Sequence, residues 1–374
     1  MPLISAGTLV LDGQICRPGW LETSGRQILA CGADPPPQPT DVDFPDSIVV
    51  PGFIDMHVHG GGGASYTDAR GIAQAAEFHL RHGTTTTLAS LVTSGPAELL
   101  AGVRALAEVT RLGTVAGIHL EGPWLSRARC GAHDPEQMRE PDPAELDAVL
   151  TAGGGTIRMV TLAPELPGCD AAIRRFVDAG VVVAVGHTDA TYEQTQYAID
   201  LGATVGTHLF NAMPRLDPRE PGPVLALLAD PRVTVELIAD GVHVHPAVVH
   251  AVIESAGSDR VALVTDAIAA AGCDDGEFRL GALPIDVVSG VARVRGTSTI
   301  AGSTATMDRL FRLVAGLGSD AALAAAVQMT SATPARALGL DRVGALRPGY
   351  DADFVVLDRD LHVTAVMANG DWRA

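Results

Sequence analysis

The stretch SIVVPGFIDMHVHGGGG, residues 47–63, decides the fold because it joins an apolar β-run to two histidines at its end. Residues i and i+2 of a strand point to the same face, so His57 and His59 are expected to share one target. Gly60 to Gly63 then let the backbone leave without side-chain obstruction. Neutral imidazole binds borderline divalent metals well. The stretch predicts a metal-binding strand end, and the alternative is a pair of solvent-facing strand histidines.

The same arrangement, an apolar run with a polar residue at its end, recurs through the middle of the chain. Eight β-runs alternate with segments of helical periodicity. Eight β/α units predict an α/β fold, a (β/α)8 TIM barrel with its functional residues at the carboxyl ends of the strands. The runs are expected to end near His57, Leu91, Glu121, Ala163, His187, His208, Asp240 and Asp266. Helices are expected over 69–82, 96–111, 143–151, 170–179, 191–201 and 246–256.

The two ends of the chain share a different character. Residues 1 to about 50 alternate short apolar stretches with turns, which is typical of a β-meander. The C-terminal runs 352–358 and 362–367 have the same pattern. The simplest interpretation joins residues 1–50 and 342–374 in one small β-sandwich domain and assigns residues 51–341 to the barrel.

Polar residues at four of the predicted strand ends are candidates for chemistry. Glu121 is costly to bury unless it is paired with arginine or ligates a metal. His187 and His208 follow strongly apolar runs, where a single histidine is usually satisfied core polarity. One glutamate and two histidines are also the ligand set of a catalytic zinc, which keeps a position open for water. Asp266 would face such a water as a general base, and the alternative is a helix N-cap.

Composition limits the class of protein. The chain of 374 residues carries a formal net charge of −18, which argues against nucleic acid and anionic membrane surfaces as partners. No apolar run is long enough to span a bilayer, and the first residues lack the basic region of a signal peptide. Five cysteines without CxxC spacing fit reduced cytoplasmic thiols. All 26 basic residues are arginine, which excludes a Schiff-base lysine and a metal pair bridged by carboxylated lysine.

A series of short motifs accompanies the predicted strands. They are Pro51–Gly60, His119–Trp124, Gly131–His133, Gly186–Thr188, Thr207–Met213, Arg219–Gly222, Ala239–His243, Val264–Ala267 and Ala301–Ser303. In this order they resemble the amidohydrolase superfamily, and within it the N-acetylglucosamine-6-phosphate deacetylase family. The likeness covers essentially the whole chain. His-x-His and the final aspartate are shared by the superfamily, whereas Leu-Glu-Gly-Pro and His-Leu-Phe-Asn-Ala-Met are far more specific.

The resemblance implies a metal centre. Glu121, His187 and His208 would hold the principal divalent ion, and His57 and His59 a second ion in members that are binuclear. Glu121 would then bridge both ions in place of a carboxylated lysine. Zinc is the expected metal, and the ligand set also suits iron, manganese and cobalt.

The resemblance also implies a set of substrate contacts. Asn211, the Ala212 amide and Arg219 would bind a sugar phosphate, with Arg219 reaching the neighbouring active site of a homodimer. Without the resemblance, Arg219 is better explained as a solvated surface charge. The full set of implied substrate-binding residues is Ala132, His133, Asn211, Ala212, Arg219, Asp240, His243, Ile300, Ala301 and Gly302.

The implied reaction is hydrolysis of the N-acetyl group of N-acetyl-D-glucosamine 6-phosphate, giving D-glucosamine 6-phosphate and acetate. Water activated by the metal would attack, with Asp266 as general base and then general acid. The expected setting is cytoplasmic amino-sugar catabolism or cell-wall recycling. Two alternatives remain open from the sequence: another amidohydrolase, such as a D-aminoacylase, a cyclic-amide hydrolase or a base deaminase, and a catalytically inactive scaffold relative.

Overall fold

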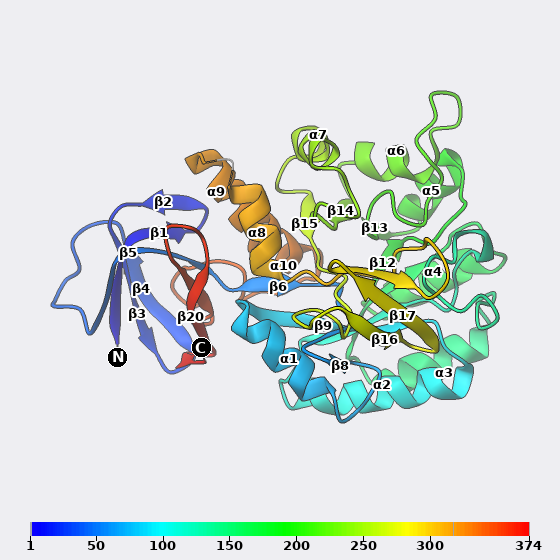
Figure 1. Cartoon of the computed structure of the whole chain (residues 1–374), viewed down its shortest axis with the longest axis horizontal. Helices are drawn as coiled ribbons and strands as arrows, with labels where there is room; N and C mark the ends of the chain where they lie inside the picture. The colour runs from blue at the N-terminus through cyan, green and yellow to red at the C-terminus, as the bar shows by residue number, and fades with distance from the viewer. Residues whose placement is uncertain (1, 317, 374) are drawn as a thin grey trace. The chain divides into compact units, whose positions relative to one another are not determined.

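The computed structural model describes residues 2–316 and 318–373. Within them, a parallel sheet of eight strands follows the order β15-β14-β13-β12-β11-β10-β9-β6 (Figure 1). The strands are β6 (Phe53–Asp55), β9 (Thr84–Val92), β10 (Gly117–Glu121), β11 (Ile157–Leu162), β12 (Val182–Val185), β13 (Ala203–Gly206), β14 (Thr234–Leu237) and β15 (Val261–Leu263). Each strand ends within three residues of its predicted end, and the predicted barrel is confirmed.

Hydrogen bonds just beyond the strands join the first and last segments of the barrel. The amide of Asp266 donates to the carbonyl of His57 over 2.9 Å, and the amide of His59 donates to the carbonyl of Ala267 over 2.8 Å. Some of the strands are short and apolar, as in the sequence VVAV of β12, because both faces of a parallel sheet are buried. The polar candidates named from the sequence at four predicted strand ends lie at the ends of these strands or within three residues of them.

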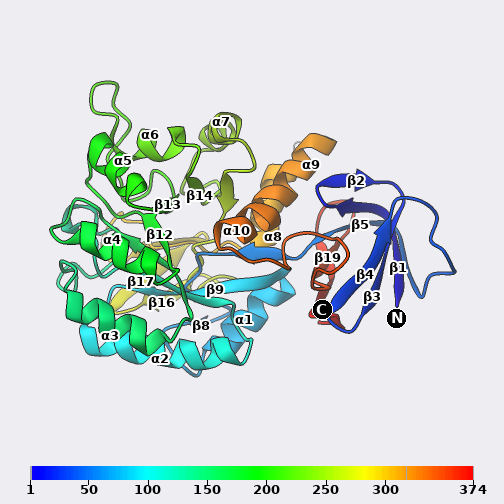
Figure 2. The same cartoon turned by 180° about the vertical axis from the view of Figure 1, so that it is seen from behind.

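Helices lie around the outside of the barrel strands (Figure 2). They are α1 (Ile72–Arg81), α2 (Pro96–Arg111), α3 (Pro143–Gly153), α4 (Cys169–Asp178), α5 (Tyr192–Asp200), α6 (Gly222–Ala229) and α7 (Pro246–Ala256). Six of them match the predicted helical segments, and α6 was not predicted. Local capping fixes several of their starts: Thr191 and Gln194 form a capping box at α5, and Asp142 caps α3. Three later helices follow, α8 (Met307–Ala315), α9 (Asp320–Val327) and α10 (Thr333–Ala337).

A small antiparallel sheet follows the last barrel strand. It consists of β16 (Gly276–Leu280), β17 (Leu283–Val288) and β18 (Val291–Val294). Leu280, Ile285 and Ala292 of this sheet pack with Ile268 and Ala301 in one buried cluster. The sequence interpretation contained no such sheet, although its last loop brings residues 298–302 to the pocket described below.

Strands from both ends of the chain form a second sheet, in the order β21-β20-β19-β5-β1-β3-β4, with β2 paired to β1. The strands are β1 (Leu3–Leu11), β2 (Gln14–Cys16), β3 (Gly19–Ser24), β4 (Gln27–Gly32), β5 (Val42–Pro51), β19 (Phe354–Leu357), β20 (Val363–Ala368) and β21 (Asp371–Trp372). The predicted union of the two ends is confirmed, in one continuous hydrogen-bonded sheet. The β-meander predicted for residues 1 to about 50 was wrong in one respect. β5 runs parallel to β1, whereas the strands of a meander pair in antiparallel fashion.

The described chain divides into two compact units. One comprises residues 1–55, 77–86 and 306–374, and the other comprises residues 56–76 and 87–305. The predicted domain limits at 50/51 and 341/342 stay a prediction. Among the described helices, none is both long and apolar enough to cross a membrane.

Candidate metal centre and active site

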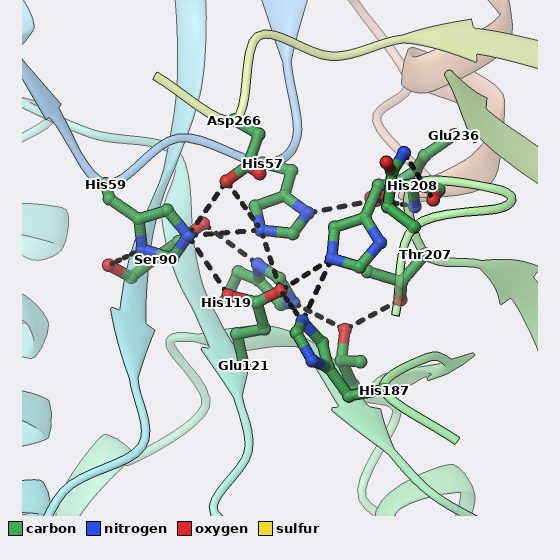
Figure 3. A network of polar contacts seen from close by, with 12 residues as sticks. His57, His59, Ser90, His119, Glu121, His187, Thr207, His208, Glu236 and Asp266 are labelled. Carbon is green, nitrogen blue, oxygen red and sulfur yellow. Dashed lines mark hydrogen bonds and ion pairs between the residues drawn. The ribbon is translucent and has the colours of Figure 1, made fainter. Parts of the chain in front are cut away.

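Three of the candidate residues have a strained backbone. His187, His208 and Asp266 adopt positive φ angles of 47°, 25° and 47°, which non-glycine residues rarely adopt. Each such conformation costs about 1–3 kcal/mol and persists only where the surrounding structure enforces it. His187 follows β12, His208 follows β13 and Asp266 follows β15, each within three residues of the strand end. The side chains of all three residues point toward the same cluster of polar groups (Figure 3).

The carboxylate of Glu121 is the centre of the cluster (Figure 3). Its Oε1 lies 3.1 Å from Nε2 of His187 and 3.0 Å from Nε2 of His208. Its Oε2 lies 3.1 Å from Nε2 of both His59 and His133. All five side chains are buried. One carboxylate thus faces imidazoles on two sides, as a bridging ligand would.

His57 and His59 form the other side of the cluster with Asp266. Their Nε2 atoms are 3.2 Å apart. Oδ1 of Asp266 lies 3.2 Å from Nε2 of His59 and 3.5 Å from Nε2 of His57. His57 also lies 3.4 Å from Oε1 of Glu121. The side chains predicted to hold two ions and a general base therefore meet in one place, from strands far apart in the sequence.

The hydrogen bonds around the histidines show that this donor set fits a cation. Nδ1 of His187 lies 2.9 Å from the carbonyl oxygen of Arg129, and Nδ1 of His59 lies 3.2 Å from that of Ser90. A carbonyl oxygen only accepts, so both Nδ1 atoms carry the proton in the neutral ring and both Nε2 atoms present a lone pair. These lone pairs face carboxylate oxygens, which also carry lone pairs. A divalent cation between them satisfies both groups, and nitrogen and oxygen ligands of this kind suit zinc and its neighbours.

The charges of the cluster depend on one another. Burial alone would raise the pKa of Glu121, but His57 and His133 hold it well below its usual value. Burial likewise opposes ionisation of Asp266, yet His57 and His59 lower its pKa to about 2. Both carboxylates are therefore ionised at neutral pH, as a metal ligand and a general base require. Burial lowers the pKa of His133 to about 4, so this imidazole is neutral.

A hydrogen-bonded chain of buried side chains lies beside these residues (Figure 3). His119 contacts Oγ of Ser90 over 2.9 Å and Oγ1 of Thr161 over 2.8 Å, and Thr161 contacts Thr207 over 2.8 Å. Burial, and next the neighbouring His57, lower the pKa of His119 well below its usual value. His119 had no assigned role in the sequence interpretation. Its ring is a neutral member of the barrel interior that packs edge-on against His57, with ring centroids 4.5 Å apart.

Sequence reasoning missed Glu236, which is fully buried on β14. Its Oε2 lies 3.0 Å from Nδ1 of His57 and accepts the amide N–H of His208 over 3.1 Å. A signal was present: a single carboxylate interrupts the apolar run 233–238. A search for polar residues at strand ends does not find it, because Glu236 lies inside its strand.

A pocket of about 290 Å³ opens at the cluster. Besides His59, Glu121, His187, His208 and Asp266, its lining includes seven of the residues predicted to bind substrate: Ala132, His133, Asn211, Ala212, His243, Ile300 and Gly302. Leu280, Ser298 and Thr299 also line it and were not predicted. Gly302 has φ of 58°, and a Cβ there would lie 2.6 Å from the carbonyl oxygen of Asp266, so a larger residue would displace the candidate base.

Three of the residues predicted to bind substrate do not line this pocket. Asp240 is buried behind the pocket, where its Oδ2 lies 2.8 Å from Nδ1 of His243 and orients that ring. Ala301 is fully buried in the apolar cluster of the small sheet. Arg219 lies on an exposed loop and is not among the described residues that line this pocket. The structure of a single chain therefore does not bring Arg219 to its own pocket.

The comparisons with known proteins agree with this geometry. A model of the amidohydrolase family matches residues 48–373. An N-acetylgalactosamine-6-phosphate deacetylase of Escherichia coli O157:H7 is 38% identical over 362 residues, covering 94% of this chain and 95% of that protein. The human N-acetylglucosamine-6-phosphate deacetylase is 38% identical over 350 residues, covering 87% and 84%.

Solved structures are similar over the full length. An aspartate-to-alanine mutant of N-acetyl-D-glucosamine-6-phosphate deacetylase from Mycobacterium smegmatis, in complex with N-acetyl-D-glucosamine-6-phosphate, has a TM-score of 0.98 and 55% identity. That match covers 100% of this chain and 99% of the other. The enzyme of the same name from Thermotoga maritima has a TM-score of 0.91 at 28% identity, covering 100% and 99%. With its barrel, its buried glutamate–histidine cluster and these relatives, this chain belongs to the amidohydrolase family.

Proposed function

We propose that this chain removes the acetyl group from N-acetyl-D-glucosamine 6-phosphate by metal-dependent hydrolysis, releasing acetate and D-glucosamine 6-phosphate. One observation carries the proposal. Glu121, His187, His208, His57 and His59 converge with Asp266 beside a pocket, in a chain 55% identical to a deacetylase of known structure. The net charge of −18 requires a local set of donors to hold an anionic substrate.

Glu121, His187 and His208 would hold the principal ion, and His57 and His59 a second one. A divalent ion bound there supplies Lewis acidity, polarising the acetyl carbonyl and lowering the pKa of water. Zinc fits the ligand set best, with iron, manganese and cobalt as alternatives. Glu121 would contact both ions, because its two oxygens face different histidines.

Asp266 moves the proton. Its ionised carboxylate accepts a proton from water as the water oxygen bonds to the acetyl carbon. As the carbon–nitrogen bond breaks, Asp266 returns this proton to the leaving nitrogen, so acetate and a free amine result. His133, which lines the pocket 3.1 Å from Glu121, is placed to orient the acetyl oxygen. Because His133 is neutral, it donates from one nitrogen without bringing a second positive charge to the site.

The sugar would lie along the rest of the pocket. Ile300 and Gly302 would contact the acetyl end, and His243, held by Asp240, would contact the sugar hydroxyls. Asn211 and the Ala212 amide would bind the phosphate. Arg219 would complete the phosphate site of a second copy in a homodimer, since its guanidinium fork matches phosphate oxygens. A phosphorylated sugar is charged and crosses no bilayer unaided, so we place the reaction in the cytoplasm.

The test is an assay of acetate release by the purified, metal-loaded chain. N-acetyl-D-glucosamine 6-phosphate should be hydrolysed with a higher kcat/KM than unphosphorylated N-acetyl-D-glucosamine. Its C4 epimer, N-acetyl-D-galactosamine 6-phosphate, is the third substrate, because one relative bears that name. A higher kcat/KM for N-acetyl-D-galactosamine 6-phosphate would change the proposed sugar but not the proposed reaction. Ammonia release without acetate would identify a deaminase instead. Equal kcat/KM values for the phosphorylated and the unphosphorylated sugar would contradict the proposed phosphate site.

A further inference from the structure

We infer that Glu236 is a positioning residue that contacts ligands of both candidate metal positions and orients His57 toward the second. A single carboxylate oxygen, Oε2, serves both sides of the centre: it faces Nδ1 of His57 over 3.0 Å and accepts the main-chain N–H of His208 over 3.1 Å. His57 belongs to the proposed second ion and His208 to the principal ion. Figure 3 shows Glu236 at the side of the His57 ring that faces away from Glu121 and His59.

The contact with His57 fixes which nitrogen faces the centre. A carboxylate accepts but does not donate, so Nδ1 of a neutral His57 carries the proton toward Glu236. Nε2 is then left with its lone pair on the side of Glu121 and His59, where it lies 3.4 Å and 3.2 Å from their nearest atoms. An anion behind a ligating imidazole also increases the electron density that the ring offers to a cation. Glu236 therefore gives His57 both its orientation and its basicity.

The contact with His208 supports an unfavourable backbone. His208 has φ of 25°, and its amide N–H donates to Glu236 while the next amide, of Leu209, donates to the Glu236 carbonyl over 2.9 Å. Two hydrogen bonds to one residue of β14 therefore hold the turn that points His208 inward. Loss of the side chain removes one of them and leaves the other.

The position of Glu236 argues against a purely structural role. The side chain is 0% exposed, and its second oxygen, Oε1, has no hydrogen-bond partner among the described residues. A buried carboxylate with an unsatisfied oxygen is costly, and the other three residues of the strand carry no charge. The benefit that offsets this cost is the charge placed behind His57.

The inference rests on the metal centre of the proposed function but not on its substrate, so metal binding without substrate is the measurement. Two variants of the full chain differ in what they keep. Glu236→Gln retains an oxygen acceptor and removes the charge, whereas Glu236→Leu removes both. Thr234→Val is the matched control, because Thr234 is buried two residues earlier on the same face of β14 and carries no charge.

Zinc affinity is measured by competition with a chelator, together with the number of zinc ions per chain at fixed free zinc. Loss of such an outer contact weakens metal binding by about 10–100-fold. We expect Glu236→Leu to show that loss at one of two sites, lowering occupancy from two ions toward one, with an intermediate loss in Glu236→Gln. Thr234→Val should bind zinc as the wild type does.

Two results would overturn the inference: two ions bound by Glu236→Leu with wild-type affinities, or equal losses in Glu236→Gln and Thr234→Val. If Glu236→Leu does not fold, the zinc affinities of Glu236→Gln and Thr234→Val decide whether the inference holds. A wild-type chain that binds only one ion, unchanged by Glu236→Gln, also overturns it. None of these results depends on which sugar is hydrolysed, so a failure here is distinguishable from a failure of the proposed reaction.

Discussion

Oδ1 of Asp266 lies 3.2 Å from Nε2 of His59, and the Asp266 amide is hydrogen-bonded to the carbonyl of His57. The candidate base and the His-x-His pair are thus joined by both a side-chain and a main-chain contact. The backbone strain at Asp266, with φ of 47°, holds the carboxylate over the pocket.

The first prediction concerns this carboxylate. Asp266→Asn keeps the size of the side chain and an oxygen toward His59 but cannot accept a proton. General acid–base catalysis contributes about 10²–10⁴-fold, so kcat should fall by that amount while the metal content stays at the wild-type level. Steady-state kinetics and metal analysis of the same sample check it. A variant with near-normal kcat would show that a group other than Asp266 accepts the proton.

The second prediction concerns stability without metal. Chelation removes an ion that binds only the folded chain, so it should destabilise the fold. An ion present at about 100 times its Kd stabilises the native state by roughly 2.7 kcal/mol, and a Tm difference of several degrees should follow. Thermal unfolding with chelator, and after zinc is restored, measures it. His208→Ala should lose most of the zinc-dependent shift, and a wild-type Tm indifferent to chelation contradicts the metal centre.

The third prediction concerns Arg219 and the proposed homodimer. Arg219→Ala and Asp266→Asn should each be nearly inactive, but a mixed dimer would contain one site with both intact residues. Random reassortment should then restore about one quarter of wild-type activity, because half of the dimers are mixed and half of their sites are complete. Activity is measured after denaturing and refolding the variants together. Failure to recover activity would mean that Arg219 serves its own chain or no active site.

The fourth prediction concerns the pH dependence of stability through His119. Burial and His57 lower the pKa of its imidazole, so the folded chain keeps His119 neutral while the unfolded chain protonates it below about pH 6.5. Its contribution is therefore fully present above that pH and is lost as the pH falls toward the folded-state pKa. Relative to His119→Gln, the wild type should lose about 1.4 kcal/mol of unfolding free energy per pH unit below 6.5. Parallel pH profiles of the two proteins would contradict it.

The sequence predicted those features that leave a local pattern. An apolar run that ends in a histidine or carboxylate marks both a barrel strand and a candidate ligand, so Glu121, His187, His208 and Asp266 were identified together. The resemblance to a family added residues such as Asn211, whose own neighbourhood gives no such signal. The union of the two chain ends followed from their shared β-character.

The features that were missed depend on contacts between distant segments. Glu236 lies inside a strand, and its role becomes visible only when the histidines of two other strands lie beside it. Leu280, Ser298 and Thr299 reach the pocket from the small antiparallel sheet, and the apolar pattern of that sheet does not reveal what it packs against. The expectation that the backbone near Asp240 lines the sugar site stays a prediction, and the Asp240 side chain holds His243, which lines the pocket.

The most direct test of the central claim is to locate the metal by anomalous diffraction from crystals of the zinc-loaded chain. We predict a peak bonded to Glu121, His187 and His208, with zinc–ligand distances of about 2.0–2.2 Å, and Asp266 facing its open position. A zinc peak elsewhere in a chain that is active in deacetylation, or none within bonding reach of Glu121, would contradict the account.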